Sequence, residues 1–322
     1  MQATLNFQEI LEAEIKKLVF PKEPKNLYDP LRYFLELGGK RTRPTLTLLA
    51  CELFGEDFNK AIDAALAVEL FHNFTLIHDD IMDAAPLRRG KPTVHHKWNG
   101  NIGILSGDVM FVEAYKLLAK YPPETLADLI ATFSQTAVEV CEGQQIDMDF
   151  EFREDVTINE YIEMIRLKTS VLLGAALKMG GIVAKANNKN LELIYNFGVQ
   201  IGIAFQLQDD ILDVYANPDK FGKQVGGDII ANKKTFLWIK AFEKANTQQL
   251  EKFNSLTNEN NKALKVKEVM ALYEELDVRK LAENKMNEFY QEAIYNLEMI
   301  DAETSSKEAL RQMAHFIMHR DV

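Results

Sequence analysis

Residues 61–83 read AIDAALAVELFHNFTLIHDDIMD, a long apolar stretch that ends in a group of aspartates. Its apolar residues recur at i, i+3, i+4 and i+7, which is the spacing of one helix face. Pro86 lies three residues beyond Asp83, so the aspartates are expected in the last turns of this helix. Residues 208–213, QDDILD, repeat the pattern at the end of a second apolar stretch, five residues before Pro218.

The same helical spacing of apolar residues covers most of the chain, including residues 126–140, 191–212 and 250–299. No proline follows Pro218, and alternating strand patterns flanked by turn residues are nearly absent. No linker rich in serine, glycine or proline divides the sequence. We therefore expect an all-α protein in which residues 1–322 form a single domain, a bundle of roughly ten or more helices.

Composition narrows the class of partners. The 322 residues are 47% hydrophobic and 26% charged, with a net charge of −11, so a nucleic-acid-binding protein is not expected. Two cysteines, Cys51 and Cys141, exclude a disulfide framework and a cysteine-based zinc site, and they favour a reducing, cytoplasmic location. The sequence shows no signal-peptide pattern and no run of 18 apolar residues, so no integral membrane segment is expected.

The paired aspartates are unfavourable as local structure. Asp79 and Asp83 share one helix face at i, i+4, as do Asp209 and Asp213, and like charges at that spacing repel. Carboxylates near a helix C-terminus also oppose the helix dipole. A solvated acidic helix end is one interpretation, but two copies favour binding of a hard cation such as Mg²⁺, which takes oxygen ligands and is usually held by one or two carboxylates plus phosphates.

Three basic, glycine-containing stretches could hold phosphate groups. They are GGKRTRP at residues 38–44, LRRGKP at 87–92 and DKFGKQVGGD at 219–228, the last running on to NKKT at 232–235. Two of them directly follow an aspartate cluster. A GxxxxGK[ST] phosphate loop is absent, so nucleotide hydrolysis of that type is not indicated. Two metal-binding clusters with their own cationic loops suggest two diphosphate groups or one diphosphate shared between both clusters.

In this order, GGKRTRP, HxxxxxxDDIMD, LRRGKPT, Lys168-Thr169, Phe205-Gln206, DDILD and GKxxGGDIxxNKKT resemble the trans-polyprenyl diphosphate synthases, the farnesyl and geranylgeranyl diphosphate synthase family. The resemblance implies a helical bundle around a central cavity, of the isoprenoid synthase type. It implies a short-chain prenyltransferase that condenses isopentenyl diphosphate with an allylic diphosphate (dimethylallyl, geranyl or farnesyl) by Mg²⁺-assisted ionisation, condensation and elimination. Family members usually form homodimers, so a homodimer is expected.

The resemblance also implies roles for single residues. Asp79, Asp83 and Asp209 would ligate Mg²⁺, supported by Asp80, Asp210 and Asp213. The metal-free isopentenyl diphosphate would be bound by Lys40, Arg43, His72 and Arg89, with Arg320 able to close over it. The allylic diphosphate would be bound by Arg88, Lys168, Thr169, Gln206, Lys223 and Lys233. Lys168, Thr169 and Gln206 are also the catalytic candidates, because Thr169 and Gln206 could present oxygens to the developing cation. Asp147 is expected in a supporting position.

Each of these residues also has an ordinary interpretation. Lys168 and Thr169 could be surface residues of a helix, and His72 a hydrogen-bonded histidine of the core. Gln206 could be a core amide. His78 is expected to serve packing or hydrogen bonding, and His95 and His96 to be structural, because adjacent histidines point apart in regular structure.

Product length would depend on residues one turn or more before Asp79. Phe74 and Thr75 would face the growing chain, with the bulky Phe74 acting as a floor. The first aspartate motif has no two-residue insertion, which resembles a geranylgeranyl synthase. We expect a product of 15 to 20 carbons, with geranylgeranyl favoured and farnesyl next. Alternatively, Phe71 and Phe74 are core aromatics without influence on chain length.

Two other functions compete with this interpretation. A class I terpene cyclase ionises the same substrates with a DDxxD motif, but it needs neither GGKRTRP nor a second DDILD. A non-catalytic regulatory subunit of a heteromeric synthase would lose aspartates, and here all six are present.

Overall fold

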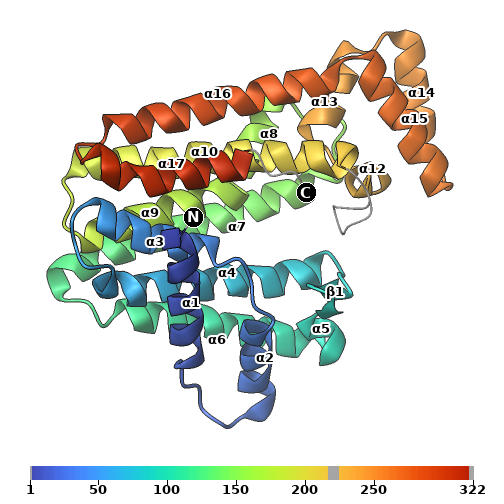
Figure 1. Ribbon diagram of the computed structural model, residues 1–322. Coiled ribbons are helices and arrows are strands. Elements are labelled where there is room, and N and C mark those ends of the chain that lie inside the picture. Colours follow the sequence, from blue (N-terminus) through green and yellow to red (C-terminus); the bar gives the residue numbers. More distant parts are fainter. Residues whose placement is uncertain (1, 217–224, 319–322) are drawn as a thin grey trace. The chain divides into compact units, whose positions relative to one another are not determined.

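Helices dominate the protein (Figure 1). The computed structural model describes residues 2–216 and 225–318, with side chains from Asn6 onward. Within those ranges the only β-structure is a two-stranded antiparallel ribbon formed by β1 (Leu87–Arg88) and β2 (Lys91–Pro92). The predicted all-α class is confirmed. None of the helices in these ranges is both long enough and apolar enough to cross a membrane.

The described residues within 1–134, 175–194 and 301–310 pack into one compact unit, and those within 135–174, 195–300 and 311–318 pack into a second. The division falls inside four helices: α7 (Pro123–Phe150), α9 (Val171–Val183), α10 (Asn188–Tyr215) and α17 (Thr304–Met318). One domain around a central cavity stays a prediction.

The first unit is built around α4 (Ile62–Met82). Its residues Ala64 to Phe71 are all buried, because α4 packs on α6 (Gly100–Leu118) and α3 (Thr42–Leu53) on different faces. The remaining elements of this unit are α1 (Gln2–Lys16), α2 (Lys25–Glu36), a 3₁₀ turn (Phe58–Ala61) and α5 (Val94–Lys97). This burial explains why residues 64–71 are apolar except for Glu69, and it holds the helix that carries the first aspartate cluster.

The second unit has a core in which Leu207 and Ile211 of α10 pack with Phe236, Tyr273 and Val278. Besides the helices that the division crosses, it contains α8 (Ile158–Ile165), a π-helical turn (Arg166–Ser170), α12 (Gly227–Ile230), α13 (Phe236–Lys244), α14 (Thr247–Thr257), α15 (Lys262–Glu275) and α16 (Val278–Met299). Several of these helices begin at a capping side chain, as sequence rules expect. Thr157 and Asn246, for example, form capping boxes with Glu160 and Gln249.

Candidate active site

The first aspartate cluster lies at the end of α4, as predicted. The backbone N–H of Asp83 donates to the carbonyl of Asp79 at 2.8 Å and closes the last turn. Asp80 is only 1% exposed, whereas Asp79 is half-buried and Asp83 is exposed. The two carboxylates at i, i+4 therefore remain accessible, and the carboxylate between them is turned into the protein.

Asp80 holds Arg88 in place. Arg88 donates from Nε to both carboxylate oxygens of Asp80 at 2.9 Å, and its Nη2 lies 2.8 Å from Oδ1. Arg88 stands on β1, and the turn that follows it contains Arg89 and Gly90 with φ of +53° and +74°. This hairpin was not predicted, because residues 87–92 were interpreted as a loop. A guanidinium has five N–H donors, so the ion pair fixes Arg88 without using all of them.

The second aspartate cluster lies in the last two turns of α10, also as predicted. Asp210 is 4% exposed and accepts hydrogen bonds from the Tyr161 hydroxyl, from Gln206 Nε2 at 3.4 Å and from the Phe236 N–H at 3.4 Å. Burial raises the pKa of Asp210 to about 8. Asp210 is thus a buried anchor for three donors, while Asp209 stays half-buried; a role of Asp210 in support of a metal stays a prediction.

The first turn of α12 contacts Asp213. The N–H of Asp228 donates to Asp213 Oδ2 at 3.0 Å, and a Cβ at Gly227 would lie 3.2 Å from Oδ1. Burial, followed by the nearby Asp228 carboxylate, raises the pKa of Asp213. Lys233 is exposed, with its Nζ 3.7 Å from Asp228. Lys223 and Arg320, which the sequence placed in the binding sites, lie outside the described residues.

Gln208, which precedes the second aspartate cluster, forms a hydrogen bond with the end of α17. Its Nε2 donates to the carbonyl oxygen of Met318, in the last turn of α17, at 2.9 Å in a buried position. Gln208 directly precedes Asp209, so the end of α17 and the second aspartate cluster share one anchor.

The aspartate carboxylates suit a hard cation only when a bound substrate supplies further oxygen ligands. Among the described residues, no group of three or more histidine, cysteine, aspartate or glutamate side chains is placed to hold a metal by itself. The first unit offers the half-buried Asp79 and the exposed Asp83, and the second unit, taken by itself, offers the half-buried Asp209. Mg²⁺ commonly keeps waters and completes its coordination with substrate phosphates, so such an open oxygen set suits it.

The stretch at residues 38–44 separates its cations. Because α3 begins at Thr42 and Arg41 adopts a left-handed φ of +47°, Lys40 lies outside the helix. Lys40 is exposed, whereas Arg43 directs its Nη1 to His72 Nε2 on α4 at 3.1 Å. Lys40 and Arg43 therefore do not share a helix face. Arg41, which was not among the predicted site residues, is buried in ion pairs.

His72 is held neutral. Burial lowers its pKa well below the usual value, and the surrounding cations Arg43, Arg89 and Arg88 lower it further. Burial also lowers the pKa of Arg43 to about 10, so this side chain remains charged at neutral pH. A neutral imidazole can accept from Arg43 through Nε2 only if its own proton is on Nδ1.

Arg89 completes a cluster of cations around His72. A Cβ on Gly39 would lie 3.1 Å from Arg89 Nη2, so the guanidinium rests on a backbone that only glycine leaves open. Gly39 also has a φ of +156°. Like charges placed together against one loop repel, and a bound anion relieves that repulsion. The structure thus brings together Arg43, His72 and Arg89 from the predicted isopentenyl diphosphate set, with Lys40 exposed on the same loop.

Lys168 and Thr169 lie on the π-helical turn, a rare element that is frequent at functional sites. Lys168 Nζ pairs with Asp147 Oδ2 on α7 at 2.5 Å, and both side chains are about 30% exposed (27% and 32%). A Cβ on Gly143 would lie 2.2 Å from the Lys168 backbone nitrogen, so α7 touches the turn directly. Asp147 thus supports Lys168.

Phe74 packs in an aromatic cluster of the first unit. Its ring stacks on Phe111 of α6 at 5.0 Å with an interplanar angle of 7°, and it meets His78 edge-on at 4.7 Å. The Thr75 hydroxyl donates to the carbonyl of His72 at 2.9 Å. His78 Nε2 lies 3.1 Å from the Ile104 carbonyl, so the packing and hydrogen-bonding role expected for His78 is confirmed.

Comparison with known proteins gives a consistent result. Residues 24–276 match the sequence profile of the Polyprenyl synthetase family. The chain is 38% identical to a geranylgeranyl pyrophosphate synthase of Geoglobus acetivorans, with 97% of each chain covered. It is also 38% identical to a geranylfarnesyl diphosphate synthase of Natronomonas pharaonis, over 73% of this chain and 74% of that one. A crystal structure of a geranylgeranyl pyrophosphate synthase superposes with a TM-score of 0.94 at 44% identity, covering 99% of both chains.

Proposed function

Because this chain belongs to the polyprenyl synthetase family and is a short-chain prenyltransferase, we propose that it condenses isopentenyl diphosphate with an allylic diphosphate to a product of 15 to 20 carbons. Geranylgeranyl diphosphate is the favoured product and farnesyl diphosphate the next. Relatives of similar identity are named geranylgeranyl and geranylfarnesyl diphosphate synthases, which supports a product near 20 carbons.

One feature of α4 carries this proposal. His72 and Asp79 are seven residues apart on α4, so they lie on the same face two turns apart, about 10 Å along the axis. His72 is surrounded by arginines and suits an anion without a metal. Asp79 and Asp83 suit an anion held through Mg²⁺. One helix face therefore offers two different diphosphate sites, which a condensation of two diphosphates needs and a one-substrate cyclisation does not.

Mg²⁺ held by Asp79, Asp83 and Asp209 would supply Lewis-acid stabilisation to the leaving diphosphate. The chain's own residues would do the rest. Arg88, oriented by Asp80, and Lys168, oriented by Asp147, would bind the allylic diphosphate oxygens, with Lys223 and Lys233. Thr169 and Gln206 would direct oxygens at the allylic cation, and the hydrogen bond that Gln206 Nε2 donates to Asp210 Oδ1 would orient Gln206 for this. Isopentenyl diphosphate would lie against Arg43, His72, Arg89 and Lys40. The released diphosphate would take the proton in the elimination.

Labelled isopentenyl diphosphate, offered with dimethylallyl, geranyl and farnesyl diphosphates in turn, tests the proposal. We expect Mg²⁺-dependent formation of longer prenyl diphosphates and no turnover in chelator. Hydrocarbon release from an allylic diphosphate alone would favour a cyclase. A purified chain that binds a partner protein but stays inactive with Mg²⁺ would favour a regulatory subunit. We also propose a cytoplasmic location, because a chain with only two cysteines suits a reducing compartment.

Phe74→Ala is expected to lengthen the product by at least one five-carbon unit, because the ring stacked on Phe111 would no longer close the space beyond the substrate tail. Chromatography of the dephosphorylated products measures this. Phe7→Ala is the matched control, since Phe7 is also buried in this unit, in an edge-on pair with Phe58 at 5.0 Å, but on α1. An unchanged product from Phe74→Ala would leave the cluster a plain part of the core.

We also propose that the enzyme is a homodimer. On α6, Ile104, Leu105 and Val112 expose 44%, 58% and 57% of their surface; Leu105 and Val112 share one helix face two turns apart, and Ile104 borders it. Large apolar side chains exposed together on one helix can mark a protein–protein contact. Leu105→Glu is expected to convert a dimer into monomers, which sedimentation velocity would detect. A wild-type chain that sediments as a monomer would refute the proposal.

A further inference from the structure

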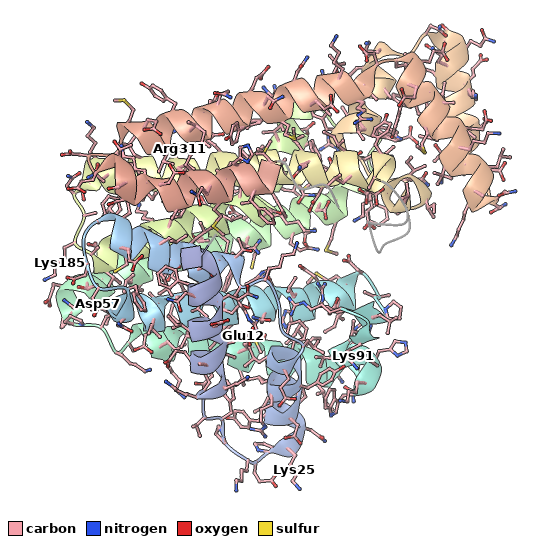
Figure 2. The ribbon with its side chains drawn as sticks, viewed as in Figure 1. Glu12, Lys25, Asp57, Lys91, Lys185 and Arg311 are labelled. Atoms are coloured by element: carbon pink, nitrogen blue, oxygen red, sulfur yellow. The ribbon has the colours of Figure 1, made fainter. Side chains whose placement is uncertain are left out.

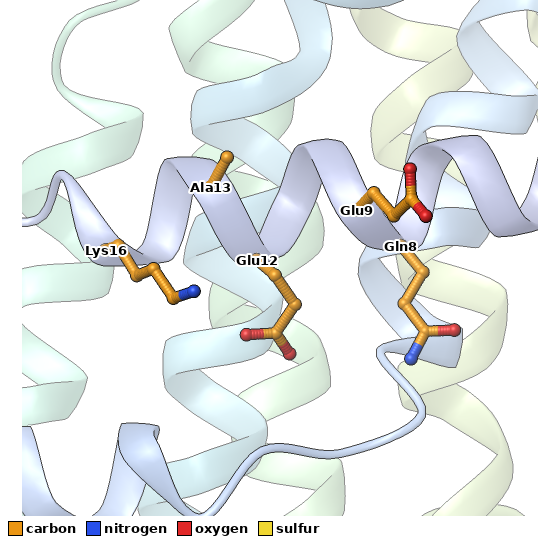
Figure 3. A pocket seen from close by; sticks show the side chains of 5 residues that line it. All are labelled: Gln8, Glu9, Glu12, Ala13 and Lys16. Atoms are coloured by element: carbon orange, nitrogen blue, oxygen red, sulfur yellow. The ribbon is translucent and has the colours of Figure 1, made fainter.

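The amino-terminal helix α1 contacts the loop that contains Gly39, Lys40 and Arg41, just before Arg43. Gln8 Nε2 donates to the carbonyl oxygen of Gly39 at 3.3 Å. Glu12, one turn later, pairs with Arg41 Nε at 2.7 Å. The side chains of Gln8 and Glu12 lie on the same side of α1 (Figure 3). Two contacts on one helix face therefore hold the loop on both sides of Lys40.

Arg41 is the centre of this arrangement. Its side chain is completely buried, and besides Glu12 it donates to Glu69 on α4 at 2.5 Å and to the Leu35 carbonyl at 3.1 Å. Its backbone has a left-handed φ of +47°, which is unfavourable for a residue with a Cβ. The three side-chain contacts keep the backbone in this conformation. The turn between Gly39 and α3 therefore depends on where the Arg41 guanidinium is held.

The same network reaches the α4 turn that carries His72. Glu69 Oε1 accepts from Asn73 Nδ2 at 2.9 Å, and Asn73 is the neighbour of His72. Arg43 meets His72 two residues beyond Arg41. Loop and helix are thus joined by two parallel links, Arg41 to Glu69 and Arg43 to His72. A shift of Arg41 would move Arg43 relative to His72.

We propose that Glu12, assisted by Gln8, is a positioning residue for the metal-free diphosphate site. Glu12 would act through Arg41, which it holds so that residues 39–43, the loop and the start of α3, present Lys40 and Arg43 in one fixed geometry. The inference rests on the proposed function, in which this loop binds isopentenyl diphosphate. It adds a residue of the first helix, 31 positions before Arg43, to the determinants of that binding.

If Glu12 acted through its charge alone, its removal would have the opposite effect on diphosphate binding, so an experiment can tell the two explanations apart. Glu12 is an anion near a site for another anion, so removing its charge should strengthen diphosphate binding if Glu12 acts only through its field. If Glu12 acts by holding Arg41, removing it should weaken binding. The fold tolerates the change, because the Glu12 side chain is 32% exposed and Arg41 keeps Glu69 and the Leu35 carbonyl.

The surroundings of Glu12 supply a matched control. Glu12 opens onto a hollow of about 510 Å³ that is lined also by Gln8, Glu9, Ala13 and Lys16 (Figure 3). Glu9 is an exposed glutamate on the same helix, and Figure 2 shows Glu12 itself on α1. Glu9→Ala therefore removes the same charge and the same side chain from α1 while leaving the contact to Arg41 in place.

Steady-state kinetics of the full-length enzyme with Mg²⁺ test the inference. Glu12→Ala is expected to raise KM for isopentenyl diphosphate about ten-fold, as small misplacements of binding groups do. KM for the allylic diphosphate and kcat should stay within about two-fold of wild type. Gln8→Ala should act in the same direction with a smaller effect. Glu12→Gln, which keeps an acceptor for Arg41, should recover part of the affinity, and Glu9→Ala should leave KM for isopentenyl diphosphate unchanged or slightly lower.

Two results would overturn the inference in an enzyme whose wild type condenses the two substrates. One is an unchanged or lowered KM for isopentenyl diphosphate in both Glu12→Ala and Gln8→Ala. The other is a parallel loss of kcat and of both affinities with a lower melting temperature, which would make the network a plain part of the fold. A wild-type chain without condensation activity would refute the proposed function itself, before any variant is compared.

Discussion

Asp79→Asn is expected to lower kcat about a thousand-fold, a loss of roughly 4 kcal/mol in transition-state stabilisation. Asparagine keeps the size and one oxygen of the aspartate but lacks the charge that would hold Mg²⁺ against the leaving diphosphate. The loss should be measured at saturating allylic diphosphate over a range of Mg²⁺ concentrations. We expect that added Mg²⁺ recovers only part of the activity. The substitution weakens the metal ligand itself and does not only lower the fraction of enzyme that holds Mg²⁺.

The same substitution should make the protein slightly more stable. Asp79 lies in the last turn of α4, where a carboxylate opposes the helix dipole by about 0.3–1 kcal/mol and repels Asp83 at i, i+4. Asp63→Asn is the control with the opposite signs. Asp63 lies in the first turn of α4, where a negative charge is favourable, and pairs with Lys120 at 2.6 Å. Its loss should lower the melting temperature and leave kcat unchanged. Full activity in Asp79→Asn would remove the metal-binding role of this motif.

Gly143→Ala is expected to destabilise the protein by about 3 kcal/mol and to abolish most of the activity. The added Cβ would lie 2.2 Å from the Lys168 nitrogen and 2.7 Å from the Leu167 carbonyl carbon, and these backbone atoms of the π-helical turn cannot rotate away. Relief requires α7 and the turn to separate, which would pull Lys168 from Asp147. Chemical denaturation and turnover measure the two losses.

Gly100→Ala is the matched control for this substitution. Gly100 is the first residue of α6, and nothing lies within 4 Å of a Cβ added there. Alanine should be neutral or stabilise the helix by up to about 1 kcal/mol. If Gly143→Ala unfolds at the same denaturant concentration as Gly100→Ala and turns over normally, then α7 does not touch the π-helical turn as the structure has it.

The sequence predicted the helical class and the places of both aspartate clusters because those features are local. Apolar spacing and the positions of Pro86 and Pro218 are enough to end α4 and α10 near Asp83 and Asp213. The stretches that carry phosphate-binding cations could also be identified, since glycine and basic residues occur together in them.

The sequence could not predict which cation of a basic stretch faces a substrate. In KRTR, Arg41 is taken by Glu12 and Glu69, which lie 29 and 28 positions away, and only the fold brings those carboxylates to it. Arg88 is likewise held by Asp80, in a hairpin whose turn places Arg89 at a positive φ that its neighbours alone would not suggest. The π-helical turn at Lys168 leaves no signature in apolar spacing, because it shifts the helix by a single residue.

The sequence also gives no sign of one contact that holds the second aspartate cluster. Tyr161 donates a hydrogen bond to Asp210 but belongs to none of the motifs. It lies on α8 among residues with ordinary amphipathic spacing.

The bond from Gln208 to the Met318 carbonyl has a practical consequence for anyone who purifies this enzyme. Only four residues would separate an affinity tag fused behind residue 322 from Met318, whose hydrogen-bond partner Gln208 adjoins Asp209. A bulky extension there would disturb the hydrogen bond between Gln208 and Met318, and a histidine-rich one would compete with Asp209 for the divalent ion. Kinetic constants are therefore best collected from protein whose handle is fused in front of residue 1 and cleaved, with a carboxyl-terminal fusion assayed only for comparison.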